Sequence, residues 1–134
     1  MSFQYTVLVD QSLILVRFDG SFSVADLTGS AVTICADERY VRGFDGLIDL
    51  SGVEISISVE DVRELVAYTL ERKKHGHGKW AVLVTGPIAT AYMMVFQHGV
   101  DGEHPVSLFS SFEGVSEFLD REIDRKSFEA ALNT

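Results

Sequence analysis

The sequence predicts an α/β protein with a single mixed, mostly parallel five-stranded sheet, an N-terminal β-hairpin and about four to five helices. Two observations predict this class. Short runs rich in β-branched and aromatic residues alternate with longer segments whose apolar residues recur at helical spacing. The first two runs are joined by a short turn, which is typical of an antiparallel pair, whereas helices separate the later runs, which favours parallel crossovers.

The first half of the chain supplies the hairpin, two helices and a third strand. Residues 3–9 and 12–18 are apolar runs on either side of a polar turn and predict the hairpin. Apolar spacing predicts a helix over about 24–38. A short buried strand is expected over 46–50, followed by an amphipathic helix from about 59 to 74.

The second half continues the alternation. A strand is predicted over 80–85, and a helix that begins at Pro87 and ends near His98 follows it. The last strand is expected over 105–109. Apolar residues then recur at helical spacing over 112–123, with a break before a final segment at 126–132. We expect residues 1–134 to form a single domain.

Composition and charge exclude several partners. The net charge of −9 and the sequence pI of 4.7 argue against nucleic acid and anionic lipid surfaces, which are bound through lysine and arginine. Cys35 is the single cysteine and cannot form an internal disulfide, and the first residues lack the pattern of an export signal. We therefore expect a cytoplasmic protein.

The stretch from Trp80 to Val100 contains no charged residue and is long enough to span a membrane. Gly86 and Pro87 divide it, however, into a strand-like part and a part with helical periodicity. The sequence therefore predicts a protein that does not span the membrane.

Three predicted helices begin with a serine followed three residues later by an acid. In this pattern the serine oxygen accepts a hydrogen bond from a backbone N–H of the first turn, and the acid returns a bond. The three pairs are Ser23 with Asp26, Ser58 with Asp61, and Ser110 with Glu113. Repetition at three corners favours a capping role for Ser58.

The segment LIDLSGV at 47–53, followed by a serine and an amphipathic helix, resembles the STAS domain of anti-sigma-factor antagonists. In that family a serine at this corner is phosphorylated. The resemblance places that serine at Ser58 and makes Asp49, Ser56 and Ser58 a candidate switch corner.

Three neighbours of Ser58 depart from the STAS motif. Ile57, Val59 and Glu60 stand where the family has Asp, Ser and Gly. A phosphate on Ser58 would also lie beside the acidic side chains of Glu60 and Asp61, which would repel it. A phosphorylation switch at Ser58 is therefore an alternative to the capping role.

Over nearly its full length the chain looks closer to the SpoIIAA-like family, which is related to STAS domains and to CRAL-TRIO lipid-transfer domains. The matching segments are FDGSFSVADL at 18–27, GLIDLSGVE at 46–54, KWAVLVTGPIATAYMMVFQ at 79–97 and PVSLFSSFEGVSEFLD at 105–120. The resemblance implies a STAS-like fold and no particular reaction.

Neither a metal site nor a catalytic centre is predicted. Four histidines could be placed around a metal with Asp101 and Glu103, but their loops lack the usual ligand spacings. These histidines are His75, His77, His98 and His104. The expected carboxyl edge of the sheet carries serines without a histidine or cysteine, so a serine nucleophile there would lack its usual base. We predict a non-catalytic protein without a cofactor; a metal-dependent hydrolase is a lesser alternative.

The helix at 87–98 is the unusual feature of the sequence because it has no charged face. Its spacing predicts a stripe that faces the sheet, formed by Ile88, Ala91, Tyr92, Val95 and Phe96. Met93 and Met94 extend the apolar surface around the helix. Something should cover it: the C-terminal helices with Phe112, Phe118 and Phe128, a second subunit, or an apolar ligand.

Two functional hypotheses follow from this helix. The first is a domain that acts through protein contacts, as a homodimer or with another protein, through Ile88, Tyr92, Met93, Met94 and Phe96. The alternative is a carrier or sensor of a small apolar, lipid-like ligand that binds under the same helix.

Overall fold

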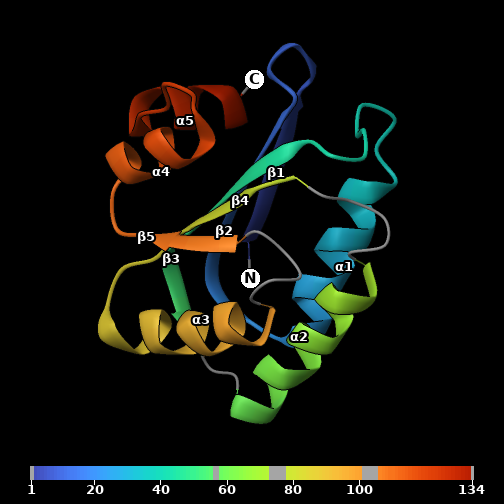
Figure 1. Ribbon diagram of the computed structural model, residues 1–134, viewed down its shortest axis with the longest axis vertical. Coiled ribbons are helices and arrows are strands. Elements are labelled where there is room, and N and C mark those ends of the chain that lie inside the picture. Colours follow the sequence, from blue (N-terminus) through green and yellow to red (C-terminus); the bar gives the residue numbers. More distant parts are fainter. Residues whose placement is uncertain (1, 56–57, 73–77, 101–105, 134) are drawn as a thin grey trace.

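The computed structural model describes residues 2–55, 58–72, 78–100 and 106–133. Within them the chain forms a five-stranded sheet and five α-helices (Figure 1). The strands are β1 (Ser2–Leu8), β2 (Leu13–Phe22), β3 (Asp45–Ile55), β4 (Trp80–Leu83) and β5 (Val106–Phe109). The helices are α1 (Val24–Cys35), α2 (Val59–Arg72), α3 (Pro87–Val100), α4 (Phe112–Leu119) and α5 (Arg125–Leu132).

The strands lie in the order β1-β2-β3-β4-β5, so neighbours in the sheet are also neighbours in the sequence. β1 and β2 pair antiparallel and the remaining pairs are parallel. Crossovers between parallel strands share one hand. Because the strands follow in order, all three crossover helices, α1 to α3, lie on one face, and α4 and α5 cover the other (Figure 1).

Each face of the sheet has its own hydrophobic core, because successive side chains of a strand point to opposite faces. In β3, Ile48 and Leu50 pack with the α1–α3 core, whereas Leu47 packs with the α4–α5 core. Phe128 of α5 is fully buried in the second core.

The predicted mixed sheet, hairpin and helices are confirmed. β3 is longer than the predicted 46–50 because β2 also continues to Phe22, and the two strands stay paired beyond an irregularity between Arg17 and Asp19. The break between the last two helices is also confirmed. It begins at Asp120, which has a left-handed backbone conformation.

One expected cover for α3 is wrong. Phe112 and Phe118 belong with Phe128 to the core on the opposite face of the sheet, so the C-terminal helices do not cover α3. The sequence left the strand order open, and the strand order decides which helices share a face.

Candidate functional site

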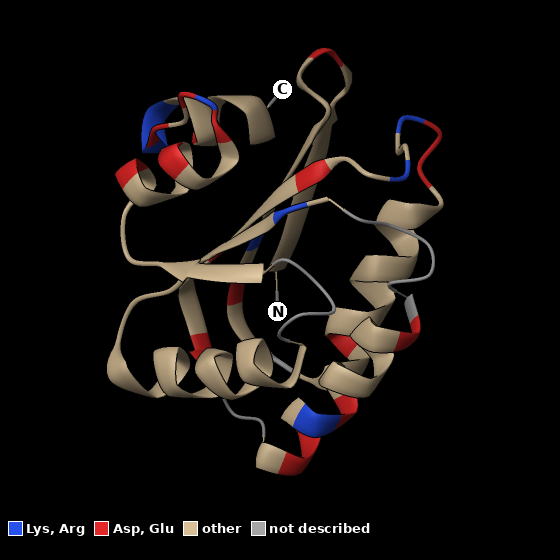
Figure 2. Cartoon of the chain, in the orientation of Figure 1, with Lys and Arg blue, Asp and Glu red and all other residues tan. Residues whose placement is uncertain are grey.

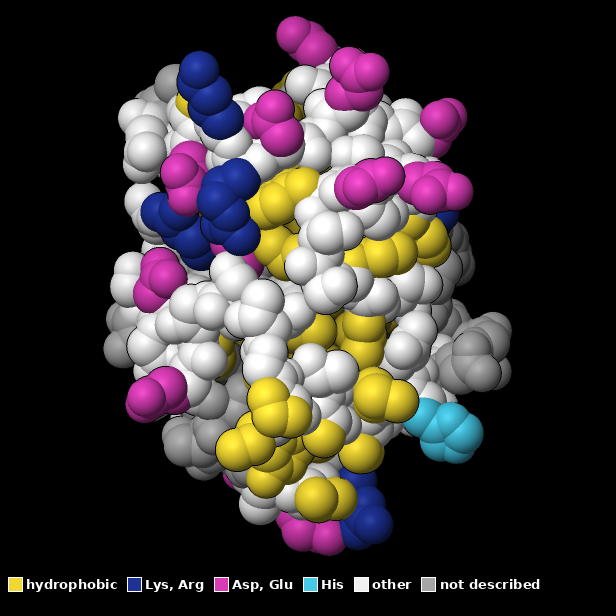
Figure 3. Space-filling view, turned by 90° about the vertical axis from the view of Figure 1, so that its left-hand side faces the viewer, with side chains coloured by type: hydrophobic (Ala, Val, Ile, Leu, Met, Phe, Trp, Pro, Cys, Tyr) yellow, Lys and Arg dark blue, Asp and Glu magenta, His cyan; other side chains and the backbone are white. Residues whose placement is uncertain are grey.

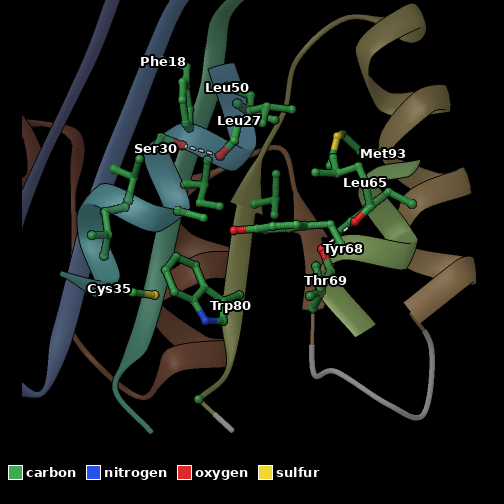
Figure 4. Close-up of a pocket in the computed structure, with 18 of the residues that line it drawn as sticks. Phe18, Leu27, Ser30, Cys35, Leu50, Leu65, Tyr68, Thr69, Trp80 and Met93 are labelled. Carbon is green, nitrogen blue, oxygen red and sulfur yellow. Dashed lines mark hydrogen bonds between the residues drawn. The ribbon is translucent and has the colours of Figure 1, made fainter. Parts of the chain in front are cut away.

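An apolar pocket of about 230 Å³ lies between the sheet and helices α1, α2 and α3. Its floor consists of side chains from β2 to β5, and its walls come from the helices and the segment before β3 (Figure 4). The sheet residues include Val16, Phe18, Ile48, Leu50, Trp80 and Val82. The helix residues include Leu27, Ser30, Ala31, Leu65, Tyr68, Thr69, Met93 and Phe96.

The pocket forms because the three helices do not pack on the sheet in the same way. α3 packs closely on β3 and β5, whereas α1 packs on α2 and α2 packs on α3. The α1 side chains that face the pocket include the small residues Ser30 and Ala31. Small side chains on a helix that stands away from the sheet leave a volume that the core does not fill.

Trp80 is held in the pocket floor by its neighbour in the sheet. Gly46 of β3 pairs with Trp80 of β4, and a Cβ on Gly46 would collide with the six-membered ring of the indole. Glycine at this position therefore lets the Trp80 ring lie against the β3 backbone. Because the chain has one tryptophan, its fluorescence reports on this pocket.

The hydroxyl groups of Ser30, Tyr40, Tyr68 and Thr69 lie among the apolar lining residues. Ser30 Oγ donates to the Leu27 carbonyl at 2.7 Å, and Thr69 Oγ1 donates to the Leu65 carbonyl at 2.9 Å. These bonds stay within α1 and α2, where serine and threonine commonly bond back to the preceding turn.

The side chain of Tyr68, which also carries a hydroxyl, extends from α2 across the pocket toward α1 (Figure 4). Its Oη lies 3.5 Å from the Thr28 carbonyl. No Asp, Glu, Lys, Arg or His occurs among the described residues that line the pocket. The site therefore combines an apolar wall with a few neutral polar groups, as small-molecule pockets commonly do.

The five residues predicted as a partner or ligand surface are divided between the two sides of α3. Met93 and Phe96 are only 8% exposed and line the pocket, on the side where a ligand under α3 was expected. Ile88 and Met94 are exposed, and Tyr92 is half-buried. The expected inward stripe is wrong in phase, since Ile88 and Val95 face outward.

The inward face of α3 consists of Ala89, Met93, Phe96 and Val100. Opposite to it, Ile88, Met94 and Val95 are 65%, 59% and 43% exposed. No charged residue occurs on α3 (Figure 2), and apolar side chains gather over this helix in the space-filling view (Figure 3).

The candidate switch corner is divided by the sheet. Asp49 is 1% exposed and points toward the α4–α5 face, where one of its carboxylate oxygens accepts hydrogen bonds from the backbone N–H and hydroxyl of Ser51. The other oxygen lies 3.5 Å from Arg125 Nη1 of α5. Ser58 begins α2 over the other face, and Ser56 lies outside the described residues.

Ser58 makes the predicted capping interactions. Its hydroxyl accepts from the Asp61 N–H at 3.1 Å, and the Asp61 carboxylate accepts from the Ser58 N–H at 2.9 Å. The same reciprocal pair is present at Ser23. At α4 the prediction is off by one residue, because Ser111 is the N-cap and accepts from Gly114.

Five of the six candidate metal ligands lie outside the described residues: His75, His77, Asp101, Glu103 and His104. His98 lies exposed near the end of α3. Within the described parts of the chain no group of three or more potential metal ligands comes together.

The sequence reasoning placed ligand binding under α3 and missed the larger contribution of α1 and α2. Leu27 and Ala31 lie in the predicted helix at 24–38, and Leu65 and Thr69 lie in the predicted helix at 59–74; apolar spacing there indicates a core and does not distinguish it from a pocket lining. A signal was present in the sequence: at these positions the two helices mix large apolar residues with small or hydroxyl-bearing ones. Such mixing leaves space that full-sized side chains would fill.

Comparison with solved structures identifies the fold. The chain is similar to an uncharacterized protein from the DUF3478 family with a SpoIIAA-like fold from Shewanella loihica PV-4. The TM-score is 0.52 at 13% sequence identity, and the match covers 80% of this chain and 83% of that one. No family model and no curated protein matches the sequence.

The chain therefore has a SpoIIAA-like, STAS-like fold, as the sequence resemblance implies. Among the described helices, none combines the length and the apolar character that a membrane crossing requires.

Proposed function

We propose that this protein binds a small apolar molecule in the pocket between the sheet and helices α1 to α3, as a carrier or sensor and without catalysing a reaction. The observation that carries this proposal is the pocket itself, an apolar space of about 230 Å³. An engineered apolar cavity of roughly 150 Å³ already binds benzene. A ligand of one or two rings, or a short alkyl chain, suits the larger space.

The driving force is the burial of apolar ligand surface. Transfer of each CH₂ group from water contributes about 0.8 kcal/mol, and aromatic lining residues such as Trp80 and Phe96 add contacts with favourable geometry. The single cysteine fits the reducing cytoplasm, where we place this role.

A direct test is titration of the purified full chain with naphthalene while the fluorescence of Trp80 is recorded. We expect saturable quenching and a higher melting temperature, because a ligand that binds only the folded state stabilises it. Native mass spectrometry of the protein as purified should show a co-purified small molecule.

The matched variant is Ala31→Leu, which places a larger side chain in the pocket. It should abolish the quenching by naphthalene and, by filling space, raise the free energy of unfolding by about 1 kcal/mol. Ala67→Leu is the control, because Ala67 lies on the exposed face of α2. Equal naphthalene binding by wild type and Ala31→Leu would contradict the proposed site.

A second candidate function is protein contact through the outer face of α3. It is favoured by the exposure of Ile88, Met94 and Val95 on a helix without charge. Contiguous exposed apolar residues commonly mark interaction sites. A stable interface buries about 800 Å² per partner, so these residues would form the centre of a larger contact, and a second copy of the chain is the simplest partner.

A further inference from the structure

Aromatic side chains line the pocket on several sides. The sheet supplies two of them, α2 and α3 supply one each, and the segment before β3 supplies two. These residues are Phe18, Trp80, Tyr68, Phe96, Tyr40 and Phe44. Because the rings come from the floor, from two helices and from a loop, a ligand in the pocket contacts several of them at once.

Two of the rings are positioned by their neighbours before any ligand enters. The Trp80 ring lies against the β3 backbone at Gly46, and the Phe18 ring stacks on Phe3 with the ring centroids 5.2 Å apart. Phe18 and Trp80 lie at opposite ends of the pocket, and the ring of Tyr68 extends between them (Figure 4). Side chains that are already ordered cost little conformational entropy when a ligand binds.

An aromatic ligand gains more from such a lining than the burial of its surface. A ring has a negative face and a positive edge, so offset-stacked and edge-to-face pairs are stabilised beyond the area that they bury. The thioether of Met93, which also lines the pocket, makes favourable contacts with aromatic rings. A saturated ring lacks this charge distribution and gains from burial and close packing alone.

We propose that the pocket selects planar aromatic molecules over saturated molecules with the same carbon skeleton. The inference rests on the function proposed above and narrows its ligand to one chemical class. In the complex, the ligand ring lies over the floor residues Ile48 and Val82, with Trp80, Tyr68 and Phe96 around it.

Hydrophobic burial by itself predicts the opposite order of affinities. A saturated ring system carries more hydrogen atoms than its aromatic counterpart and therefore exposes more apolar surface to water. If burial alone decided, the saturated molecule would bind at least as tightly, because the gain is proportional to the apolar area removed from water. A preference for the aromatic molecule therefore measures the contribution of the rings.

Naphthalene and decahydronaphthalene test this selectivity, because both have the same fused skeleton. Each is titrated into the full chain with calorimetry as the readout. Decahydronaphthalene is also used to displace bound naphthalene, which is followed by the recovery of Trp80 fluorescence. Since several ring pairs form in the complex, we expect naphthalene to bind about threefold to tenfold more tightly.

A variant assigns the preference to one ring. Phe96→Leu removes a lining ring and keeps an apolar residue that suits a helix. It should lower the affinity for naphthalene about threefold to tenfold and leave that for decahydronaphthalene unchanged. A residue that only shaped the space would change both affinities alike.

The matched control is Phe112→Leu, which removes a ring from the core on the opposite face of the sheet. It should leave both affinities unchanged.

The outcomes separate the two proposals. If decahydronaphthalene binds as tightly as naphthalene or more tightly, the aromatic selectivity is overturned while apolar binding stands. If neither molecule binds, the proposed function fails and the inference fails with it. Should Phe96→Leu not fold, the comparison of the two ligands on the wild type still decides.

Discussion

The carboxylate of Asp49 lies in β3 and contacts the C-terminal helix instead of solvent. Its partners are Ser51 on the same strand and Arg125 of α5, whose guanidinium also lies over the Phe112 ring. A buried carboxylate is stable only when it is paired and hydrogen-bonded. The residue that the STAS resemblance placed in a switch corner is thus a structural anchor between the sheet and α5.

A second acidic residue, Asp37, makes the clearest electrostatic contribution. Its carboxylate accepts hydrogen bonds from Arg39 Nε and Nη2 at 3.0 and 2.8 Å and from the Tyr5 hydroxyl at 2.8 Å. The Arg39 side chain, with further bonds from its backbone N–H and from Tyr5, lowers the pKa of Asp37 far below its usual 3.8. The contacts tie the segment after α1 to the edge strand β1.

The first prediction concerns the pH dependence of stability. Because the pKa of Asp37 is lowered by folding, its contribution to stability is complete above pH 3.8 and is lost as the pH falls below that value. Asp37→Asn should therefore be less stable than wild type at neutral pH, and the difference should shrink at about pH 3. Urea unfolding of Asp37→Asn and wild type at both pH values measures this difference in the free energy of unfolding.

The charge control for that experiment is Asp10→Asn, in the exposed turn between β1 and β2. A difference between Asp37→Asn and wild type that stays constant with pH would show that Asp37 acts through its shape and not through its charge.

The helix starts show how a local pattern can identify a structure and still miss its position. Ser23 and Ser58 cap α1 and α2 as predicted, with an acid three residues later. At α4 two serines stand in succession, and an acid three residues after Ser110 suggested the first of them. The backbone selects Ser111, which has an extended conformation and accepts from the Gly114 N–H at 3.3 Å.

Adjacent serines provide a matched pair of variants for the second prediction. Ser111→Ala should lower the free energy of unfolding by about 1 kcal/mol, the usual cost of losing an N-cap. Ser110→Ala removes an exposed hydroxyl one residue earlier and should change the free energy of unfolding by less than about 0.5 kcal/mol. Chemical denaturation of both variants measures the two changes. An equal loss of unfolding free energy in both variants would mean that Ser111 does not cap the helix.

The phase of α3 is the clearest error at the scale of an element. A helix with a polar face can be oriented from its sequence, because the polar face must meet water. α3 offers two apolar stripes, and spacing alone could not choose between Ile88 with Val95 and Met93 with Val100. Packing against β3 and β5 turned the second stripe inward and left the first exposed.

At the scale of the whole molecule, the order of the strands explains both candidate functions. Three crossover helices share one face of a five-stranded sheet, while two short helices cover the other face. On the first face, α1 and α2 leave the pocket, and α3 presents an outer surface on which Ile88, Met94 and Val95 are exposed.

The third prediction tests that surface in the intact protein. If a second copy covers α3, light scattering should give roughly twice the 14.8 kDa of one chain. Ile88→Glu combined with Met94→Glu should restore the monomer, because charges at the centre of an interface are costly to desolvate.

Two controls accompany the prediction about α3. Thr90→Glu with Gln97→Glu adds the same charge to α3 at half-buried positions away from the exposed stripe and should leave the mass unchanged. A wild type that stays monomeric at high concentration would exclude a second copy as the partner, while the pocket and its ligand tests would be unaffected.

The sequence by itself determined the elements of this protein. Alternating apolar runs, helical spacing and serine caps are local properties, and they predicted the hairpin, the mixed sheet, α1 to α3 and the break before α5. Local rules succeed here because backbone hydrogen bonds and side-chain direction depend on residues within a few positions of each other.

Tertiary structure alone decided where those elements leave space and which side of α3 faces out. The pocket depends on the distance of α1 and α2 from β2, β3 and β4, and that distance follows from packing between residues far apart in the chain. The order of the strands likewise put Phe112, Phe118 and Phe128 on the face opposite α3. Volume left between elements is a property of their arrangement, and no single segment encodes it.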